Sequence, residues 1–296
     1  MPERLDHALA SRRLCRSRTA AARSIAAGQV HVNGRLATKA SMPVSETDRI
    51  EVTAGPGYVS RAAQKLLAAA DSFALDISER AVLDLGASTG GFTQVLLERG
   101  AREVVALDVG HDQLDALLRA DTRVTVIEGE NARYLTEQRL DSCIAAARVG
   151  RAPLTAKDIT AVVGDLSFIS LRHILPAMRA SLPNLHWAVL LVKPQFEVGR
   201  RFVRGGIVTD AEVAADATVD VVRDARELGF RVCGFRQSPI TGTHGNHEYL
   251  LWLQLPNDAH RAQNTASGDA ASLDARQSHN EIDIAHIRET VVKGNS

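Results

Sequence analysis

Hydrophobic positions follow two different organisations along the chain, and the change between them lies near residue 57. In residues 4 to 25, apolar residues such as Leu5, Ala8 and Leu9 recur at helical spacing, which predicts two short helices. The alternating segment Val30-His31-Val32 then leads into Asn33-Gly34, a strong hairpin signal, and another short strand is expected at residues 50 to 52. Residues 1 to 57 are therefore predicted to form a small α+β domain.

After residue 57, short apolar strands alternate with helical stretches. Strands are predicted at residues 81–86, 103–108, 123–128, 159–165, 187–192, 231–235 and 248–255, and helices at 58–73, 91–99, 112–118, 171–182 and 211–228. This alternation predicts a doubly wound α/β sheet in residues 58 to 255. Residues 142 to 156 are interpreted as a polar surface loop. Residues 256 to 296 are expected to be a disordered tail, with or without a short terminal helix.

Composition narrows the class of protein. The 296 residues are 45% hydrophobic, which is ample for a packed core. The three cysteines are far apart, so we expect neither a disulfide framework nor a metal site. The sequence contains no apolar run near the roughly 20 residues that span a bilayer. These features predict a cytoplasmic protein that does not enter membranes.

The zero net charge hides a basic front on an acidic body. Residues 1 to 70 contain eleven Lys and Arg against five Asp and Glu, which leaves 35 − 11 = 24 basic and 35 − 5 = 30 acidic residues in the remainder. The front therefore carries +6 and the rest −6. This distribution is typical of a nucleic-acid-binding module joined to another domain.

The basic front also resembles a known module. Residues 4 to 52, with Ser17-Arg18, the GQVHVNG turn and the D-x-I-x-V ending, resemble the S4 RNA-binding domain over its whole length. The resemblance implies RNA contact by the helix pair. Its candidate phosphate contacts are Arg4, Arg12, Arg13, Arg16, Arg18 and Arg23. Because aromatic residues are missing from this domain, we expect it to recognise the shape of folded RNA.

The segment VLDLGASTGGFTQVLL, residues 82 to 97, places a strand, a glycine-rich turn and a helix in succession. The glycines would let backbone amides approach a ligand closely. Asp84 precedes the turn, and Asp108 ends the next strand about 20 residues on, where a carboxylate binds ribose hydroxyls. The Gly-x-x-x-Gly-Gly spacing departs from the dinucleotide pattern, which disfavours a nicotinamide enzyme.

The glycine turn resembles the S-adenosylmethionine loop of FtsJ-like RNA ribose methyltransferases. With the S4 front and the blocks YVSRAAQKL, GDLSFISLRHILPA, LVKPQFEVG and SPITGTHGNHEYLLWL, residues 4 to 255 resemble the TlyA family of ribosomal RNA cytidine-2′-O-methyltransferases, also called haemolysins. The resemblance implies a Rossmann-like class I methyltransferase with a seven-stranded, mostly parallel sheet. It also implies S-adenosylmethionine as cofactor and ribosomal RNA in ribosomal subunits, 16S, 23S or both, as substrate. We expect a monomer.

The resemblance also assigns site residues. A Lys-Asp-Lys-Glu constellation falls on Lys65, Asp165, Lys193 and Glu248. Around the cofactor it implies Asp84, Gly86, Ala87, Ser88, Gly90, Gly91, Phe92, Thr93, Asp108, Glu130 and Asn131.

Lysine is rare in this chain, since five lysines stand among 35 basic residues. An arginine cannot act as a base, whereas a desolvated lysine can lose its proton near neutral pH. We expect Lys193 to lie nearest the ribose 2′-oxygen, but the sequence leaves open which lysine is the base. Two other functions also stay open: a non-catalytic RNA-binding assembly factor and a membrane-active haemolysin.

Overall fold

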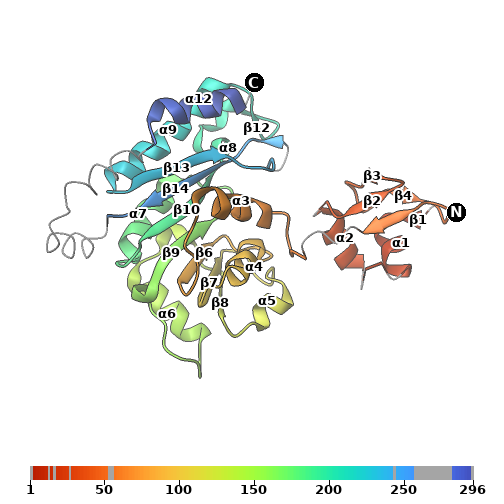
Figure 1. Ribbon diagram of the computed structural model, residues 1–296, viewed down its shortest axis with the longest axis horizontal. Coiled ribbons are helices and arrows are strands. Elements are labelled where there is room, and N and C mark those ends of the chain that lie inside the picture. The colour runs from red at the N-terminus through yellow and green to blue at the C-terminus, as the bar shows by residue number, and fades with distance from the viewer. Residues whose placement is uncertain are drawn as a thin grey trace.

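The computed structural model describes residues 3–12, 14–15, 18–26, 28–52, 57–242, 245–256 and 282–294, without the side chains of Ala20 and Arg23. Two separate groups of elements are visible, a small N-terminal domain and a larger α/β body (Figure 1). The small domain has its own hydrophobic core. The predicted fold class, an α/β methyltransferase-type sheet behind a small α+β domain, is confirmed.

The small domain packs two helices on short strands. Its elements are β1 (Glu3–Arg4), α1 (Leu5–Ser11), α2 (Arg18–Ala26), β2 (Val30–Val32), β3 (Arg35–Leu36), β4 (Pro43–Val44) and β5 (Ile50–Val52). The strands pair in the order β3-β2-β5, with β1 beside β4. Asn33 and Gly34 both have positive φ, 51° and 77°, as the predicted tight hairpin between β2 and β3 requires.

The body is built on a seven-stranded sheet. Its strands are β6 (Ala81–Leu85), β7 (Glu103–Asp108), β8 (Val124–Glu128), β9 (Ile159–Gly164), β10 (Trp187–Val192), β13 (Arg231–Gln237) and β14 (Tyr249–Gln254). They lie in the order β13-β14-β10-β9-β6-β7-β8, and β14 runs antiparallel to both of its neighbours. The strand order reverses between β6 and β9, and ligands of open α/β sheets bind in the crevice at such a point.

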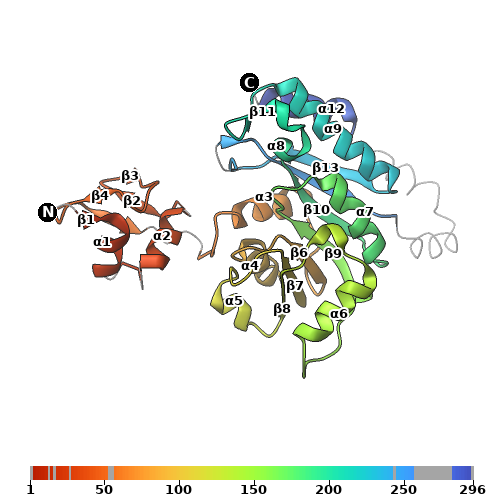
Figure 2. The same cartoon turned by 180° about the vertical axis from the view of Figure 1, so that it is seen from behind.

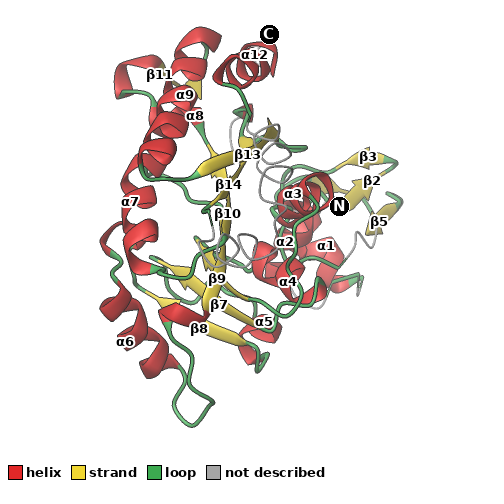
Figure 3. Cartoon of the chain, turned by 60° about the vertical axis from the view of Figure 1, so that its left-hand side comes forward, coloured by secondary structure: helices red, strands yellow, loops and turns green. Residues whose placement is uncertain are grey.

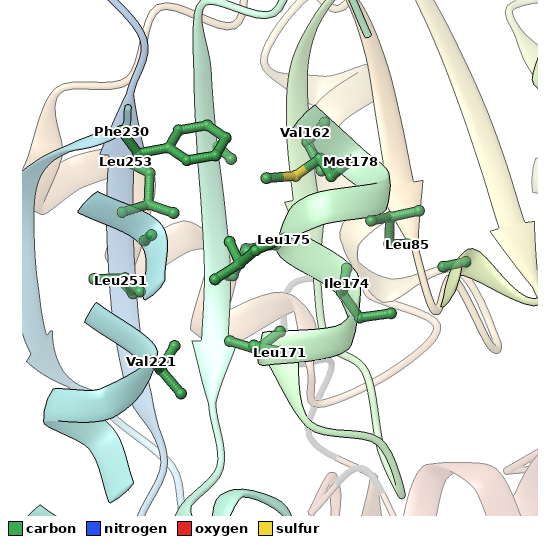
Figure 4. Close-up of a cluster of buried hydrophobic side chains, with 14 of the residues drawn as sticks. Leu85, Val162, Leu171, Ile174, Leu175, Met178, Val221, Phe230, Leu251 and Leu253 are labelled. Carbon is green, nitrogen blue, oxygen red and sulfur yellow. The ribbon is translucent and has the colours of Figure 1, made fainter. Parts of the chain in front are cut away.

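Helices cover both faces of the sheet (Figures 2 and 3). In Figure 3, α3 (Ala63–Phe73), α4 (Gly91–Glu98) and α5 (Ala116–Ala120) lie on one face, and α6 (Glu137–Ala147), α7 (Leu171–Ser181) and α9 (Ala211–Glu227) lie on the other. Figure 4 shows α7 directing Leu171, Ile174, Leu175 and Met178 at the strands. The four side chains recur every three or four residues, so one helix face is buried.

Short elements follow β10 and complete the rim of the sheet. They are α8 (Pro194–Glu197), β11 (Val203–Arg204) and β12 (Ile207–Val208), with 3₁₀ turns at Ala132–Tyr134, Ala156–Asp158 and Arg200–Phe202. None of the helices in the described ranges is long and apolar enough to span a bilayer.

One expectation was wrong, and the structure adds to a second. The predicted surface loop at residues 142 to 156 was wrong in its first half, because α6 continues to Ala147 with Leu140 and Ile144 buried. Near the end of the chain, α12 (Ile284–Gly294) packs against α9 and β13 and buries Ile287 and Val291. A boundary at residue 255 therefore leaves out residues that complete the core, although most of residues 256 to 296 lie outside the described ranges.

Candidate functional site

Four charged side chains from distant parts of the sequence meet at one edge of the sheet. Lys65 lies on α3, Asp165 follows β9 and Lys193 follows β10. Glu248 immediately precedes β14, and because β14 runs in the opposite direction, its beginning lies at the same edge. The predicted constellation is therefore brought together beside the point where the strand order reverses.

The four groups form a closed network of alternating charge. Lys65 Nζ donates to Asp165 Oδ2 at 2.9 Å and to Glu248 Oε2 at 2.6 Å. Lys193 Nζ is 2.7 Å from Asp165 Oδ1 and 3.9 Å from Glu248 Oε1. Each carboxylate thus faces both ammonium groups, and the quartet is electrically balanced.

Burial makes this network costly to disrupt. Lys65 and Lys193 are each 6% exposed, and Glu248 is 3% exposed. Burial alone would raise the pKa of the Asp165 carboxyl, but the attraction of Lys193 and Lys65 outweighs it and lowers that pKa. Removing one partner would leave a buried charge uncompensated.

The local chain fixes the direction of Lys193. Lys193 is the residue before α8, and Pro194 occupies the first turn of that helix, where its missing N–H costs nothing. Lys193 Nζ also donates to Ser167 Oγ at 2.8 Å. One turn further on, the Glu197 carboxylate accepts from Leu171 N at 2.9 Å and so caps α7. The loop after β9 and the helix after β10 are therefore tied together at two places.

Two adjoining cavities open at this edge. A cavity of about 420 Å³ is lined by all four charged residues and by Gly86, Ala87, Ser88, Gly91 and Phe92. A larger one, of about 1110 Å³, is lined by Asp108, Glu130 and Asn131 and shares Gly86 and Ser88 with the first. Eight of the eleven predicted cofactor residues thus line one or both of these adjoining cavities.

The glycine loop between β6 and α4 passes close to its neighbours. Gly86 has φ +77°, and a Cβ there would lie 3.2 Å from the Asp165 carbonyl oxygen. At Gly91 a Cβ would lie 3.1 Å from the backbone nitrogen of Ala63. Asp108 holds the loop by accepting from Ser88 N at 2.8 Å and Gly110 N at 2.7 Å. Side chains at these glycines would displace the elements that carry Asp165 and Lys65.

Three residues predicted to contact the cofactor line neither cavity. Asp84 is completely buried and accepts a hydrogen bond from Thr93 Oγ1 at 2.7 Å. Its burial raises the pKa of Asp84 to about 7, against the opposing effect of that hydrogen bond. Gly90, with φ +97°, packs against Leu114 and Leu118. Asp84 and Thr93 therefore lie in the interior beneath the loop, and Gly90 faces Leu114 and Leu118 within it.

Glu130 and Asn131 lie beside the larger cavity, each with partners of its own. Arg139 of α6 donates two hydrogen bonds to Glu130 Oε2, at 3.0 and 2.7 Å. The Asn131 side chain accepts from Arg133 N at 3.0 Å and begins the 3₁₀ turn Ala132–Tyr134. Arg139 had no sequence signal that linked it to the site.

Several cavity-lining residues were not predicted. They are Ser60, Arg61, Thr89, Ser167, Phe168, Gln195, Phe196 and Asn246. Phe168 is 91% exposed, has φ +64° and lies 5.2 Å from Phe196 between ring centroids. The signal available for most of them was their place inside sequence blocks that also carry the four charged residues.

The arginines of the small domain have partners within that domain. Arg4 and Arg18 both donate to Asp6, with distances of 3.0 to 3.1 Å, and their side chains stay 54% and 57% exposed. Arg12 is 25% exposed and donates to the carbonyl oxygens of Ser45 at 2.8 Å and Asp48 at 3.1 Å. Arg13, Arg16 and the side chain of Arg23 lie outside the described residues. Arg12 thus ties α1 to the segment between β4 and β5.

The sheet order, the glycine loop and the buried charges define a class I methyltransferase fold. Its polar pocket lies where the strand order reverses between β6 and β9. Residues 58–255 match the FtsJ-like methyltransferase family, and residues 3–50 match the S4 domain. The chain therefore belongs to the FtsJ-like methyltransferase family, with an S4 domain before the catalytic body.

Named relatives are similar over most of the chain. The 16S/23S rRNA (cytidine-2′-O)-methyltransferase TlyA of Mycobacterium tuberculosis is 45% identical over 258 residues, which cover 86% of this chain and 91% of the relative. Hemolysin A of Brachyspira hyodysenteriae is 39% identical over 248 residues, which cover 83% of this chain and 98% of the relative. A solved structure described as a hemolysin from Streptococcus thermophilus is 35% identical, with a TM-score of 0.64 and coverage of 86% of this chain and 89% of that chain.

Proposed function

We propose that this protein transfers a methyl group from S-adenosylmethionine to the 2′-hydroxyl of cytidine in ribosomal RNA, with 16S RNA, 23S RNA or both as substrate. The observation that carries the proposal is the buried quartet of Lys65, Asp165, Lys193 and Glu248 in a cavity that opens beside the glycine loop. The relatives named as cytidine-2′-O-methyltransferases supply the nucleotide and the RNA class.

The two cavities fit the proposed cofactor. Asp108 and Glu130 offer carboxylate oxygens in the larger cavity, suited to ribose hydroxyls and to an amino group. Gly86 and Gly91 let the glycine loop pack closely against the segments that carry Asp165 and Lys65, and both glycines line the smaller cavity. When bound, S-adenosylmethionine supplies an activated methyl group on a sulfonium.

The remaining task for the chain's own residues would be to remove the proton of the ribose 2′-hydroxyl. A ribose hydroxyl is a weak nucleophile and must lose its proton as it attacks, so a base must lie within hydrogen-bond reach. Lys193 Nζ is directed by Asp165 and Ser167 and lines the smaller cavity. We assign it to the 2′-oxygen: after its ammonium has released a proton to solvent through the cavity, the neutral amine takes the proton of the 2′-hydroxyl, while Lys65 and Glu248 orient the network around Asp165. Holding the oxygen in line with the methyl group supplies much of the remaining acceleration.

The mouth of the cavity suits an unstacked nucleotide. Phe168 and Phe196 form a tilted aromatic pair there, and Phe168 is almost fully exposed. Aromatic faces stack on bases that have left their RNA helix. The small domain, which contains no aromatic residue, would hold folded RNA through exposed arginines such as Arg4 and Arg18.

Incubation with tritiated S-adenosylmethionine and purified ribosomal subunits tests the proposal. We expect label in 2′-O-methylcytidine and loss of label with Lys193→Ala. RNA binding without methyl transfer would favour a non-catalytic assembly factor. The hemolysin names of two relatives suggest membrane lysis as another alternative. Release of dye from liposomes tests it, and we expect no release.

A further inference from the structure

Gln195 lies where the two cavities join. It belongs to the first turn of α8, two residues after Lys193, and it lines both the smaller cavity and the larger one. Phe168 and Phe196 line both cavities as well. A ligand that passes between the ammonium of Lys193 and the aromatic pair would therefore meet the Gln195 side chain.

The amide oxygen of Gln195 needs a donor. Its Oε1 atom is buried and has no hydrogen-bond partner among the residues that the structure describes. An unsatisfied buried acceptor costs about 1 to 3 kcal/mol, so nearly all such groups in folded proteins find a partner. Because Gln195 lines both cavities, a rotation of its side chain would turn this covered oxygen toward a bound ligand, which can supply the missing donor.

We propose that Gln195 recognises the Watson–Crick edge of the target cytosine, an inference that rests on the proposed function. The base is attached to the ribose carbon next to the one that bears the 2′-oxygen, so it must lie close to whatever holds that oxygen. Lys193 and Gln195 are two residues apart and line the same cavity. Gln195 is therefore within the neighbourhood that the base occupies.

The chemistry of the two partners is complementary. Cytosine presents the N4 amino group as a donor beside N3 as an acceptor, and a glutamine amide presents an acceptor beside a donor. Oε1 accepts from N4, and Nε2 donates to N3. Uracil carries O4 and N3–H at the same places, so this orientation of the amide sets acceptor against acceptor and donor against donor.

Methyl transfer to two forms of the ribosomal subunit tests the inference. After the methylated nucleotide is mapped, subunits with cytidine at that position are compared with subunits in which uridine replaces it. For the wild-type protein we expect the rate on cytidine to exceed that on uridine by about tenfold or more, as a bidentate contact to a base allows.

Two variants of Gln195 should lose this preference. Gln195→Ala removes both contacts, and Gln195→Glu keeps the size of the side chain but replaces the donor with an acceptor. We expect each variant to be about tenfold slower on cytidine and to show a cytidine-to-uridine ratio within about threefold of one. Gln138→Ala is the matched control, because Gln138 is exposed on α6 and lines neither cavity.

Calorimetry with S-adenosylhomocysteine separates the base from the cofactor as the partner of Gln195. We expect an unchanged Kd in both Gln195 variants. A weakened Kd together with an unchanged cytidine-to-uridine ratio would overturn the inference and assign Gln195 to the cofactor. An unchanged ratio with an unchanged Kd would overturn it as well. No methyl transfer by the wild-type protein would overturn the proposed function, and the inference would fall with it.

Discussion

The small domain and the pocket around Lys65, Asp165, Lys193 and Glu248 both pair cations with carboxylates, but they do so with different residues in different surroundings. In the small domain, Arg4 and Arg18 share the carboxylate of Asp6 and stay more than half exposed. In the pocket, Lys65 and Lys193 are almost fully buried and share Asp165 and Glu248. The first arrangement leaves guanidinium groups available to a polyanion, and the second leaves ammonium groups available only to what enters the cavity.

This difference follows from the chemistry of the two cations. A guanidinium keeps its charge at any ordinary pH and presents a flat set of donors that suits phosphate. An ammonium is a compact charge whose protonation responds to its surroundings, so it can take part in proton transfer. The chain uses arginine at 30 of its 35 basic positions, yet two of its five lysines lie in one pocket.

The largest expected effect comes from replacing Lys193 of the pocket with arginine, the basic residue that the small domain uses. Lys193→Arg places a guanidinium there that cannot lose its proton, so unlike the neutral lysine amine it cannot accept the proton of the 2′-hydroxyl, and we expect methyl transfer to fall by about 10²- to 10⁴-fold. Lys193→Ala should fall at least as far. Both are measured as label transferred to ribosomal subunits.

Lys157→Ala is the matched control for this substitution, because Lys157 is an exposed lysine paired with Glu137 outside both cavities. It should keep the wild-type rate. Full activity in Lys193→Arg would contradict a role for Lys193 as the base and would leave it a purely electrostatic one.

A second large effect concerns stability and pH. Burial raises the pKa of Asp84 to about 7 in the folded protein, above the 3.8 of an ordinary aspartate. Between pH 4 and pH 7 the folded protein retains a proton that the unfolded chain has released. This group's contribution to the free energy of unfolding therefore falls by about 3 kcal/mol over that range and levels off above it.

Asp84→Asn removes this titration. The difference in unfolding free energy between variant and wild type, measured by denaturant melts without cofactor, should shift in favour of the variant as pH rises from 4 to 7. The small domain offers the opposite case, because Arg4 and Arg18 hold the pKa of Asp6 below its usual range. A pH-independent difference for Asp84→Asn would contradict the buried, protonated state.

Much of the body was predictable because its signals are local. Alternating apolar runs gave all seven sheet strands to within a few residues, and Asn33-Gly34 gave the hairpin of the small domain. The meeting of Lys65, Asp165, Lys193 and Glu248 was predictable only through family resemblance, because residues 65 and 248 are 183 positions apart and nothing local links them.

The missed features depend on tertiary packing. The sequence allowed a short helix near the end of the chain, but it did not predict that Ile287 and Val291 of α12 would pack against α9. Asp84 and Thr93 belong to the motif that suggested a cofactor site, but in the fold they are buried and hydrogen-bonded to each other. Likewise, Arg12 is of the residue type that contacts phosphate, and only the fold brings the carbonyl oxygens of Ser45 and Asp48 to it.

A smaller effect is expected at Arg12, which distinguishes a structural arginine from an RNA-binding one. Arg12→Ala removes two hydrogen bonds to backbone carbonyls that are partly shielded from water, and we expect the small domain to lose about 1 to 2 kcal/mol of stability. Hydrogen exchange of amides in β2 and β5 reports this loss. If exchange is unchanged while RNA binding weakens, Arg12 acts on RNA directly.

The smallest effect is expected at Arg18, which tests whether an exposed arginine of the small domain contacts RNA. Its side chain is 57% exposed and has a carboxylate partner, so Arg18→Ala should leave the fold intact and weaken RNA binding several-fold. If Arg18 contacts one phosphate, the slope of log affinity against log salt should fall by about one unit. Arg223→Ala, an exposed arginine on α9, is the matched control and should leave the slope unchanged. An unchanged slope in Arg18→Ala would mean that Asp6 neutralises this arginine within the domain, and that the basic front binds RNA through other residues.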